Sequence, residues 1–169
     1  MISIHIVAMP TAFEKLQSGM PQIIERLKRK MTLLMLQLQS RIVGESIPAF
    51  FPNGAPNIAG SVRAIPAELE GTIIHGEVQA GGPRTTKVTL KSGAQVDYAA
   101  VQHEGIAHSY EIRPFNKKAL AFLLDGKQVI TKLVHHTGLQ PRPYMTSELQ
   151  NMESQIVEEL QQEFMAALQ

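Results

Sequence analysis

The chain has 169 residues, 44% of them hydrophobic, and its 16 Lys and Arg against 15 Asp and Glu give a net charge of +1. These values predict a single domain over residues 1–169 with a sizeable core, and they disfavour a globally basic nucleic-acid binder. The absence of cysteine excludes disulfide frameworks, thiolate metal sites and cysteine nucleophiles. No apolar run reaches the roughly 18 residues of a membrane helix, and the first residues lack the positive start of a signal peptide. We therefore expect a soluble protein that is not exported.

The first residues of the chain alternate in polarity. Ile2, Ile4 and Ile6 are separated by polar residues, which predicts a short strand with one buried face. A short helical piece is expected to begin at Pro10, and Gly19 interrupts it.

A long apolar stripe follows, in which hydrophobic residues recur every three or four positions. This period predicts a helix over residues 20–44, ending at Gly44. Leu33, Leu36 and Val43 widen the stripe, so we expect the helix to be buried on more than one side. The stripe itself consists of Met20, Ile23, Ile24, Leu27, Met31, Leu34, Met35, Leu38 and Ile42.

Residues 44–60 hold three prolines and three glycines. Such a composition opposes a regular helix or a central strand, so we expect a long loop. Loops of this length are usually functional or mobile. Ile47, Phe50 and Phe51 are too apolar for a free tether, and we expect them to fix the loop to another surface.

Strand-like patterns begin at residue 61. The strongest local signal is Asp125-Gly126, which predicts a two-residue hairpin turn because both residue types tolerate positive φ. Three other segments alternate in polarity or are rich in β-branched residues, and a tight turn joins the first two; they are residues 72–80, 85–91 and 109–114, with the turn at 80–84.

The chain closes with a second predicted helix. After an expected loop over residues 135–143, an apolar stripe predicts a helix over residues 145–168, which Thr146 or Ser147 can cap. The order of patterns predicts an α+β fold in which one antiparallel sheet packs against the long N-terminal helix and the C-terminal helix.

Histidines suggest a metal site, but their spacing does not support one. His103 and His108 are five residues apart, whereas a metal-binding helix places its histidines four apart on one face. His135 and His136 are adjacent, so in a strand they point to opposite faces. Residues 81–87 depart from a phosphate-binding loop, and no pair of carboxylates or nucleophile motif stands out. We therefore expect no enzyme activity, no catalytic residue, no metal and no cofactor.

A basic run on the predicted N-terminal helix contains Arg26, Lys28, Arg29 and Lys30. It forms either a solvated helix face or a contact with DNA or with an acidic partner. Residues 144–169 offer such a partner, since they contain five Glu and no Lys or Arg. Helices of complementary charge can pair within one chain or between copies.

Four segments follow one another along the chain. They are Pro-Asn-Ile-Ala-Gly-Ser-Val at 56–62, Tyr-Ala-Ala-Val-Gln-His-Glu-Gly at 98–105, Ile-Arg-Pro-Phe-Asn-Lys-Lys-Ala-Leu-Ala-Phe at 112–122, which leads into the hairpin, and His136–Met145 with its Arg-Pro-Tyr-Met before the terminal helix. This succession resembles the tail-completion, or neck, proteins of long-tailed bacteriophages, also described as minor tail components or virion morphogenesis proteins. One departure is Ile106, which stands where the family has Thr after Glu-x-Gly.

The resemblance implies a non-enzymatic structural protein of the virion, located at the head–tail junction and in the host cytoplasm during assembly. It implies a homo-oligomeric ring, with a hexamer favoured over a dodecamer, that lets DNA pass. The implied partners are a head-closure or connector protein, a tail terminator or tail tube protein, and transiently the genomic DNA, but no membrane. A head-closure or tail-terminator role in the same virion region is the neighbouring possibility.

We expect the two loops at 44–60 and 135–143 to carry the contacts between subunits or rings. The candidate interface residues are Ile47, Phe50, Phe51, Arg142 and Tyr144. Aromatic and arginine side chains anchor many interfaces, and flanking prolines hold Arg142 in a restricted backbone. The alternative is that the aromatic residues fold back onto the core of their own chain.

Two other functions remain open from the sequence. One is a small metal-dependent hydrolase that uses His103, His108, His135 and His136. The other is a DNA-binding accessory factor that uses the basic run at 26–30. Stoichiometric metal in the purified protein would favour the first, and strong, salt-dependent binding to duplex DNA would favour the second.

Overall fold

The computed structural model describes residues 1–8, 21–89, 95–114, 117–124 and 126–167. The predicted helical piece over 10–19 lies outside these residues. A three-stranded antiparallel sheet forms the first layer, in which the central β3 (Ile73–Ala80) pairs with β1 (Ile2–Ala8) on one side and β2 (Arg63–Glu70) on the other. Burial alternates along β3, because one face of the sheet is covered and the other is open.

The long predicted N-terminal helix is present as α2 (Pro21–Arg41), and it packs on the covered face of the sheet. At Gly76 of β3 an added Cβ would lie 2.8 Å from the Met31 side chain, which shows how closely helix and strand approach. Leu33 and Leu36 are 56% and 49% exposed, so the prediction that they widen a buried stripe is wrong.

The segment at 44–60 is largely helical, contrary to the loop prediction. A π-helical turn η1 (Ile42–Ser46) continues α2 into α3 (Ile47–Phe50), and α4 (Pro56–Ala59) follows. Pro48 and Pro56 stand in the first turns of α3 and α4, where a missing N–H costs no hydrogen bond. The prolines therefore begin short helices here instead of preventing them.

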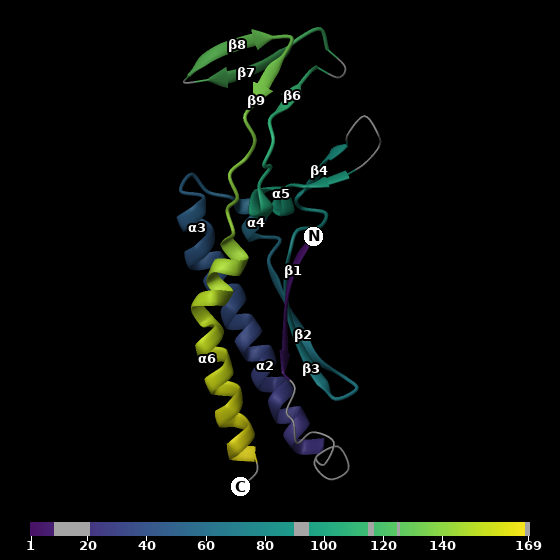
Figure 1. The fold of residues 1–169 in the computed structure, drawn as a ribbon, viewed down its shortest axis with the longest axis vertical. Coiled ribbons are helices and arrows are strands. Elements are labelled where there is room, and N and C mark those ends of the chain that lie inside the picture. The colour runs from purple at the N-terminus through teal and green to yellow at the C-terminus, as the bar shows by residue number, and fades with distance from the viewer. Residues whose placement is uncertain (9–20, 90–94, 115–116, 125, 168–169) are drawn as a thin grey trace.

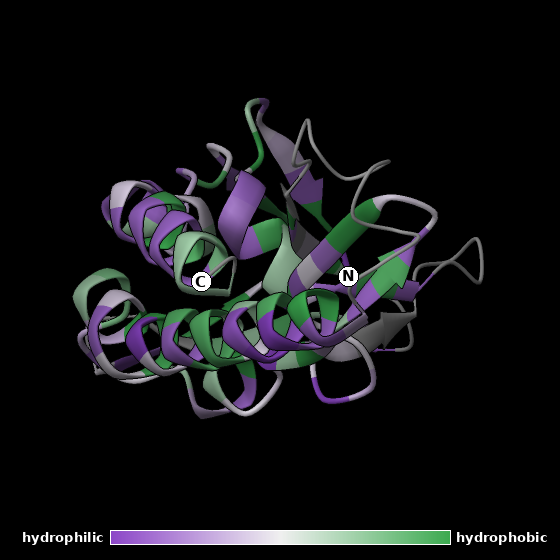
Figure 2. Ribbon diagram, turned by 90° about the horizontal axis from the view of Figure 1, so that it is seen from below, coloured by the Kyte–Doolittle hydropathy of each residue, from purple (hydrophilic) through white to green (hydrophobic). Residues whose placement is uncertain are grey.

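The C-terminal helix α6 (Tyr144–Ala167) lies along α2 (Figure 1). Figure 2 shows the molecule from below and coloured by hydropathy, and α2 carries both hydrophobic and hydrophilic positions around its axis. One hydrophobic core joins the helices and the sheet and confirms the α+β fold class; its largest fully buried side chains are Met31, Leu34, Met35, Leu38, Ile42, Ile58, Ile74, Val78, Tyr144, Met145 and Met152. Among the described helices, none combines the length and hydropathy that a membrane crossing requires.

The remaining strands form three separate two-stranded ladders, so the single predicted sheet is divided into four. The first ladder joins β4 (Thr86–Thr89) to β5 (Gln95–Asp97), and the unpredicted helix α5 (Tyr98–Glu104) follows at once. The other two ladders are β6 (Tyr110–Ile112) with β9 (Val134–His136), and β7 (Leu120–Leu124) with β8 (Lys127–Thr131).

These last two ladders form a projection at one end of the molecule (Figure 1), which we call the arm and define as residues 106–139. The β7–β8 pairing ends at Leu124 and Lys127, so positions 125 and 126 connect the strands as predicted. Gly126 has φ of 76°, the positive value that such a turn requires, while Asp125 lies outside the described residues. We call the rest of the described chain the body.

Candidate functional site

The arm leaves the body through two glycines. Gly105 and Gly138 both have positive φ, 75° and 99°, and between them Ile106 and Leu139 exchange backbone hydrogen bonds of 2.8 and 2.9 Å. A Cβ at Gly105 would lie 2.5 Å from the Leu139 carbonyl oxygen, and one at Gly138 would collide with the Ile106 carbonyl oxygen. The two crossing chains can therefore approach this closely only because neither residue has a side chain.

Below the glycines, α5 and the start of α6 are joined by polar contacts. The Arg142 guanidinium donates to the Gln102 side-chain oxygen at 3.0 Å, and the Arg142 backbone N–H donates to the Gln102 carbonyl at 2.9 Å. The Tyr144 hydroxyl donates to the Ala99 carbonyl at 3.2 Å. The segments 98–105 and 136–145, which the sequence analysis singled out separately, thus meet at the base of the arm.

Three of the five predicted interface residues belong to the core of their own chain. Ile47, Phe51 and Tyr144 are 3%, 7% and 0% exposed, so they have no surface to offer a neighbouring subunit, and their assignment to an interface is corrected. Phe51 packs edge-on against Tyr144, and the Arg142 guanidinium lies 4.8 Å from the centre of the Phe51 ring. The alternative, in which the aromatics fold back, holds for Phe51; Phe50 and Arg142 remain half-buried.

Burial at this joint favours the neutral forms of Tyr144 and His103. Burial raises the pKa of Tyr144 well above its usual value, and the charge of Asp97 adds to the effect. Burial also lowers the pKa of His103, although Glu104 opposes this shift. The His103 ring packs edge-on against Tyr144, and its buried Nε2 has no hydrogen-bond partner among the described residues. Both rings therefore take part in the packing at the base of the arm.

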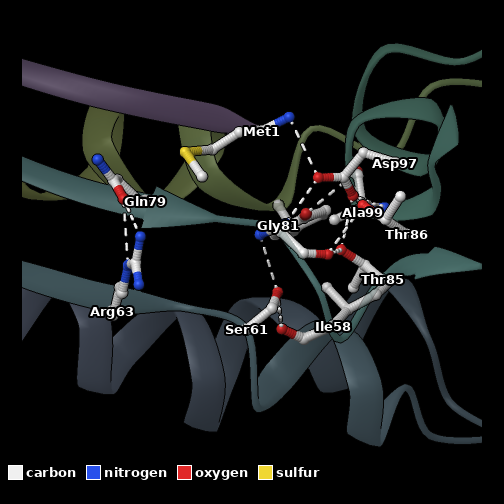
Figure 3. A network of polar contacts seen from close by, with 12 residues as sticks. Met1, Ile58, Ser61, Arg63, Gln79, Gly81, Thr85, Thr86, Asp97 and Ala99 are labelled. Atoms are coloured by element: carbon white, nitrogen blue, oxygen red, sulfur yellow. Dashed lines mark hydrogen bonds and ion pairs between the residues drawn. The ribbon is translucent and has the colours of Figure 1, made fainter. Parts of the chain in front are cut away.

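Asp97 is the centre of a second polar cluster (Figure 3). Its carboxylate accepts hydrogen bonds from the backbone N–H groups of Gly82 and Ala99 and from the Thr85 hydroxyl at 2.8, 3.0 and 2.6 Å, and the Met1 amino group lies 3.1 Å away. Burial alone would raise the pKa of Asp97, but these donors outweigh it and lower the pKa to about 2. Asp97 therefore caps α5 and ties the glycine turn at 81–82 to it.

The basic run of α2 finds its partners within the chain. Arg26 and Lys30 pair with Glu163 and Glu159 of α6 at 2.8 and 2.6 Å. The hydrogen bond from Lys30 lowers the pKa of Glu159. Of the two possibilities left open by the sequence, pairing within one chain is the one observed. Lys28 pairs with Glu25 of its own helix at 3.0 Å, whereas exposed Arg29 makes no ion pair among the described residues.

A further ion pair joins the same helices near the body's centre. Arg41 Nε lies 2.8 Å from Glu148 Oε1, and Glu148 is only 4% exposed. The two atoms are not aligned as a hydrogen bond, and neither has another partner in the described chain. The contact is therefore an ion pair that shields a buried carboxylate.

The histidines of the hydrolase hypothesis are held in different surroundings. His136 stacks on Tyr110 in the arm with 4.8 Å between ring centres, His135 lies 3.6 Å from Glu111, and His103 packs on Tyr144. Within the described residues there is no group of three or more His, Asp or Glu that could hold a metal ion.

The arm exposes apolar and basic side chains that the interface prediction did not include. Between Gln102 and Tyr144, none of the residues whose burial the structure describes is buried, and Ile112, Phe122 and Ile130 are 37%, 38% and 68% exposed. Lysines 117, 118, 127 and 132 are exposed and make no ion pair among the described residues. The signal was available in the sequence, because the strands around Gly126 carry apolar residues on both faces.

Two shallow hollows lie on the body. One, of about 450 Å³, lies between α2 and β2 and is lined by Glu25, Lys28, Arg29, Thr32, Leu33 and Ala67. The other, of about 330 Å³, lies on the open face of the sheet and is lined by His5, Ile65, Pro66, Glu68, Glu70, His75 and Glu77. They differ in charge, since the first has more basic than acidic residues and the second has three carboxylates.

No protein-family model, curated protein or solved structure matches this chain. Its function is therefore inferred from its own residues and surfaces.

Proposed function

We propose that the chain is a structural protein of the head–tail junction of a long-tailed bacteriophage, a neck or tail-completion protein that assembles into a homo-oligomeric ring. The observation that carries the proposal is the arm, which exposes Ile112, Phe122 and Ile130 and in which none of the residues whose burial the structure describes is buried. A two-stranded ladder of this kind is marginal on its own in water, and exposed apolar clusters mark protein contacts. A protein partner would cover these apolar residues of the arm.

The motifs behind the resemblance to neck proteins support the same proposal. Two of the four segments, 98–105 and 136–145, meet at the base of the arm through Gln102 and Arg142. The third begins at Ile112 within the arm, and the fourth, at 56–62, contains α4 and the approach to β2. Two of the four segments therefore connect the projecting arm to the body.

Charge is compatible with a ring around DNA. A strongly basic channel would retain a duplex, which carries one negative charge per roughly 1.7 Å, whereas this chain has a net charge of only +1. A hexamer is favoured and a dodecamer is the other candidate. The ring would contact a head-closure or connector protein on one side and a tail terminator or tail tube protein on the other.

Native mass spectrometry and negative-stain microscopy of the purified chain test the ring. We expect a closed oligomer with a central opening, and a monomer at all concentrations would contradict the proposal. In the phage that encodes the chain, loss of its gene should leave filled heads and complete tails that do not join. Normal virions without it would also contradict the proposal.

A further inference from the structure

We propose that the arm of one subunit docks on the open face of the β1-β3-β2 sheet of the next subunit, so that the copies associate head to tail. This inference rests on the proposed ring and names the two surfaces that close it. The occupant of the open sheet face is thus a second copy of this chain.

The arm is the basic surface of the contact. Its residues 106–139 contain five Lys and Arg against two Asp and Glu, so the rest of the chain is net acidic. Arg113 is engaged by Glu111 at 2.7 Å, but the four lysines make no ion pair in the described chain. The strand register pairs Phe122 with Val129 and Ile130 with Ala121, so exposed Phe122 and Ile130 lie on opposite faces of the β7–β8 ladder. With the lysines, they give the arm a basic and partly apolar surface that suits an acidic partner with an apolar centre.

The open sheet face supplies the acidic surface. Because Gly76 faces α2, the alternation of β3 turns His75 and Glu77 to the opposite side. The pairing of β2 with β3 puts Glu68 opposite His75 and Ile65 opposite Glu77. Glu68, Glu70 and Glu77 therefore border one hollow, which Ile65 and Pro66 also line.

The groups around this hollow do not neutralise it. His5 and His75 lie 3.7 and 3.5 Å from Glu77 and Glu70. Glu77 also accepts a hydrogen bond from Gln79 at 2.7 Å, whereas the neighbouring Arg63 is bound to Gln79. Glu68 has no ion pair among the described residues, so the hollow keeps carboxylates for the lysines of the arm.

The basic hollow between α2 and β2 is the natural competitor, and it has the wrong charge. Lys28 and Arg29 line it together with exposed Leu33, so it would repel the lysines of the arm. Its apolar surface could receive Phe122, but its positive charge disfavours the arm, whereas the negative charge of the sheet face favours it. Because of this difference in charge, the basic hollow serves as the matched control for the acidic one.

The shape of the molecule requires the contact to be between copies. The arm projects at one end of the molecule, away from the β1-β3-β2 sheet (Figure 1). The arm and the sheet face are therefore separate surfaces, and each copy can give one contact and receive another. Such heterologous contacts form rings when the rotation closes.

Charge reversals on each surface test the contact, with native mass spectrometry and sedimentation as the measurements. We expect the arm variant Lys127→Glu with Lys132→Glu, and the face variant Glu68→Lys with Glu70→Lys, each to weaken self-association at least tenfold. Carrying both pairs of changes on one chain should restore the oligomer. Mixing the two variants should also restore an oligomer, with the variants alternating, because the reversed arm meets the reversed face and the wild-type arm meets the wild-type face.

The control variant reverses Lys28 and Arg29 to Glu in the basic hollow and should leave the oligomer intact. All the substituted residues are exposed or half-buried, and circular dichroism verifies that each variant folds. If the wild type forms a ring that the arm and face variants leave unchanged, the contact is overturned and the ring stands. If the wild type stays monomeric, the ring fails and the contact with it.

Duplex DNA is the other acidic surface that a basic arm could meet. Titrating the protein with a 30-base-pair duplex at two salt concentrations distinguishes DNA binding by the arm from docking of the arm on another copy. Loss of salt-dependent DNA binding in the arm variant, with its oligomer unchanged, would overturn docking between copies. Loss of the oligomer, together with rescue by the combined reversal, supports it.

Discussion

The body and the arm are built from similar residues but use them differently. In the body, β3 buries every second residue against α2, and its other residues face outward. In the arm, β8 has no buried residue, although it contains Val129 and Ile130. The body is therefore complete as a single chain, whereas the arm leaves its apolar residues in water. The difference indicates that burial within the chain accounts for the apolar residues of the body but not for those of the arm.

The largest effect that should separate the two regions comes from core truncation. Leu38 is fully buried, and Leu38→Ala should lower the free energy of unfolding by about 2–5 kcal/mol because it leaves a cavity. The matched change Ile130→Ala in the arm should alter it by less than about 0.5 kcal/mol, since Ile130 is 68% exposed. Urea denaturation of the monomeric subunit measures both. Similar losses would mean that the arm is packed against the body.

Asp97 should give the next largest effect, and it depends on pH. Its pKa is 3.8 as a free group and about 2 in the folded chain, so its contribution is present above pH 4 and is lost as the pH falls toward 2. Asp97→Asn should cost roughly 2 kcal/mol at neutral pH. Denaturation curves from pH 7 to pH 2 should show a weaker acid dependence in the variant. The same loss of stability at low pH in both proteins would mean that the Asp97 carboxylate does not make these hydrogen bonds.

The base of the arm allows a local test. Gly138→Ala combines a strained positive φ with a collision against the Ile106 carbonyl, and it should cost about 1–2 kcal/mol. Gly126→Ala is the control, because Gly126 also has positive φ but its Cβ would meet nothing within 4 Å. Hydrogen exchange should show faster exchange of the β6 and β9 amides in Gly138→Ala only, with the body unaffected. Equal exchange rates in both variants would mean that the close approach of Gly138 to the Ile106 carbonyl oxygen does not stabilise the base of the arm.

The smallest expected effect lies in the ion pairs between the helices. Lys30→Gln removes the pair with Glu159 and should cost less than about 1 kcal/mol, because both side chains are partly exposed. The cost should shrink further in 0.5 M salt. Thermal unfolding at two salt concentrations measures it. A loss as large as that of Leu38→Ala would mean that charge, not the apolar core, sets the packing of α2 on α6.

The sequence predicted the elements of the body well because burial on one side leaves a period. The stripe from Ile23 to Leu38 and the alternation of Ile2 and Ile6 each mark one covered face. It failed where composition was ambiguous. Pro48 and Pro56 indicated a loop, since proline at the first turn of a helix and proline in a loop look alike in sequence.

The joint at the arm's base could not be predicted for a different reason. Gln102, Arg142 and Tyr144 are far apart in the chain from Phe51, and no local pattern indicates that they meet. Phe51 and Tyr144 were assigned to an interface because aromatic residues often anchor interfaces. Their burial in their own chain depends on contacts between distant segments, which the sequence does not show. The helix α5 was missed because its seven residues are too few to show a helical period.

The hydrogen bonds between Ile106 and Leu139 have a consequence for how this chain can change over evolution. They close the arm at a point where its two ends are already adjacent, so the residues beyond them form an insertion with a fixed attachment. Residues can be added to or removed from such an insertion in pairs without moving α5 or α6. Arm length and partner choice can therefore diversify while the body is conserved, and arms can be exchanged between related chains by recombination at Gly105 and Gly138.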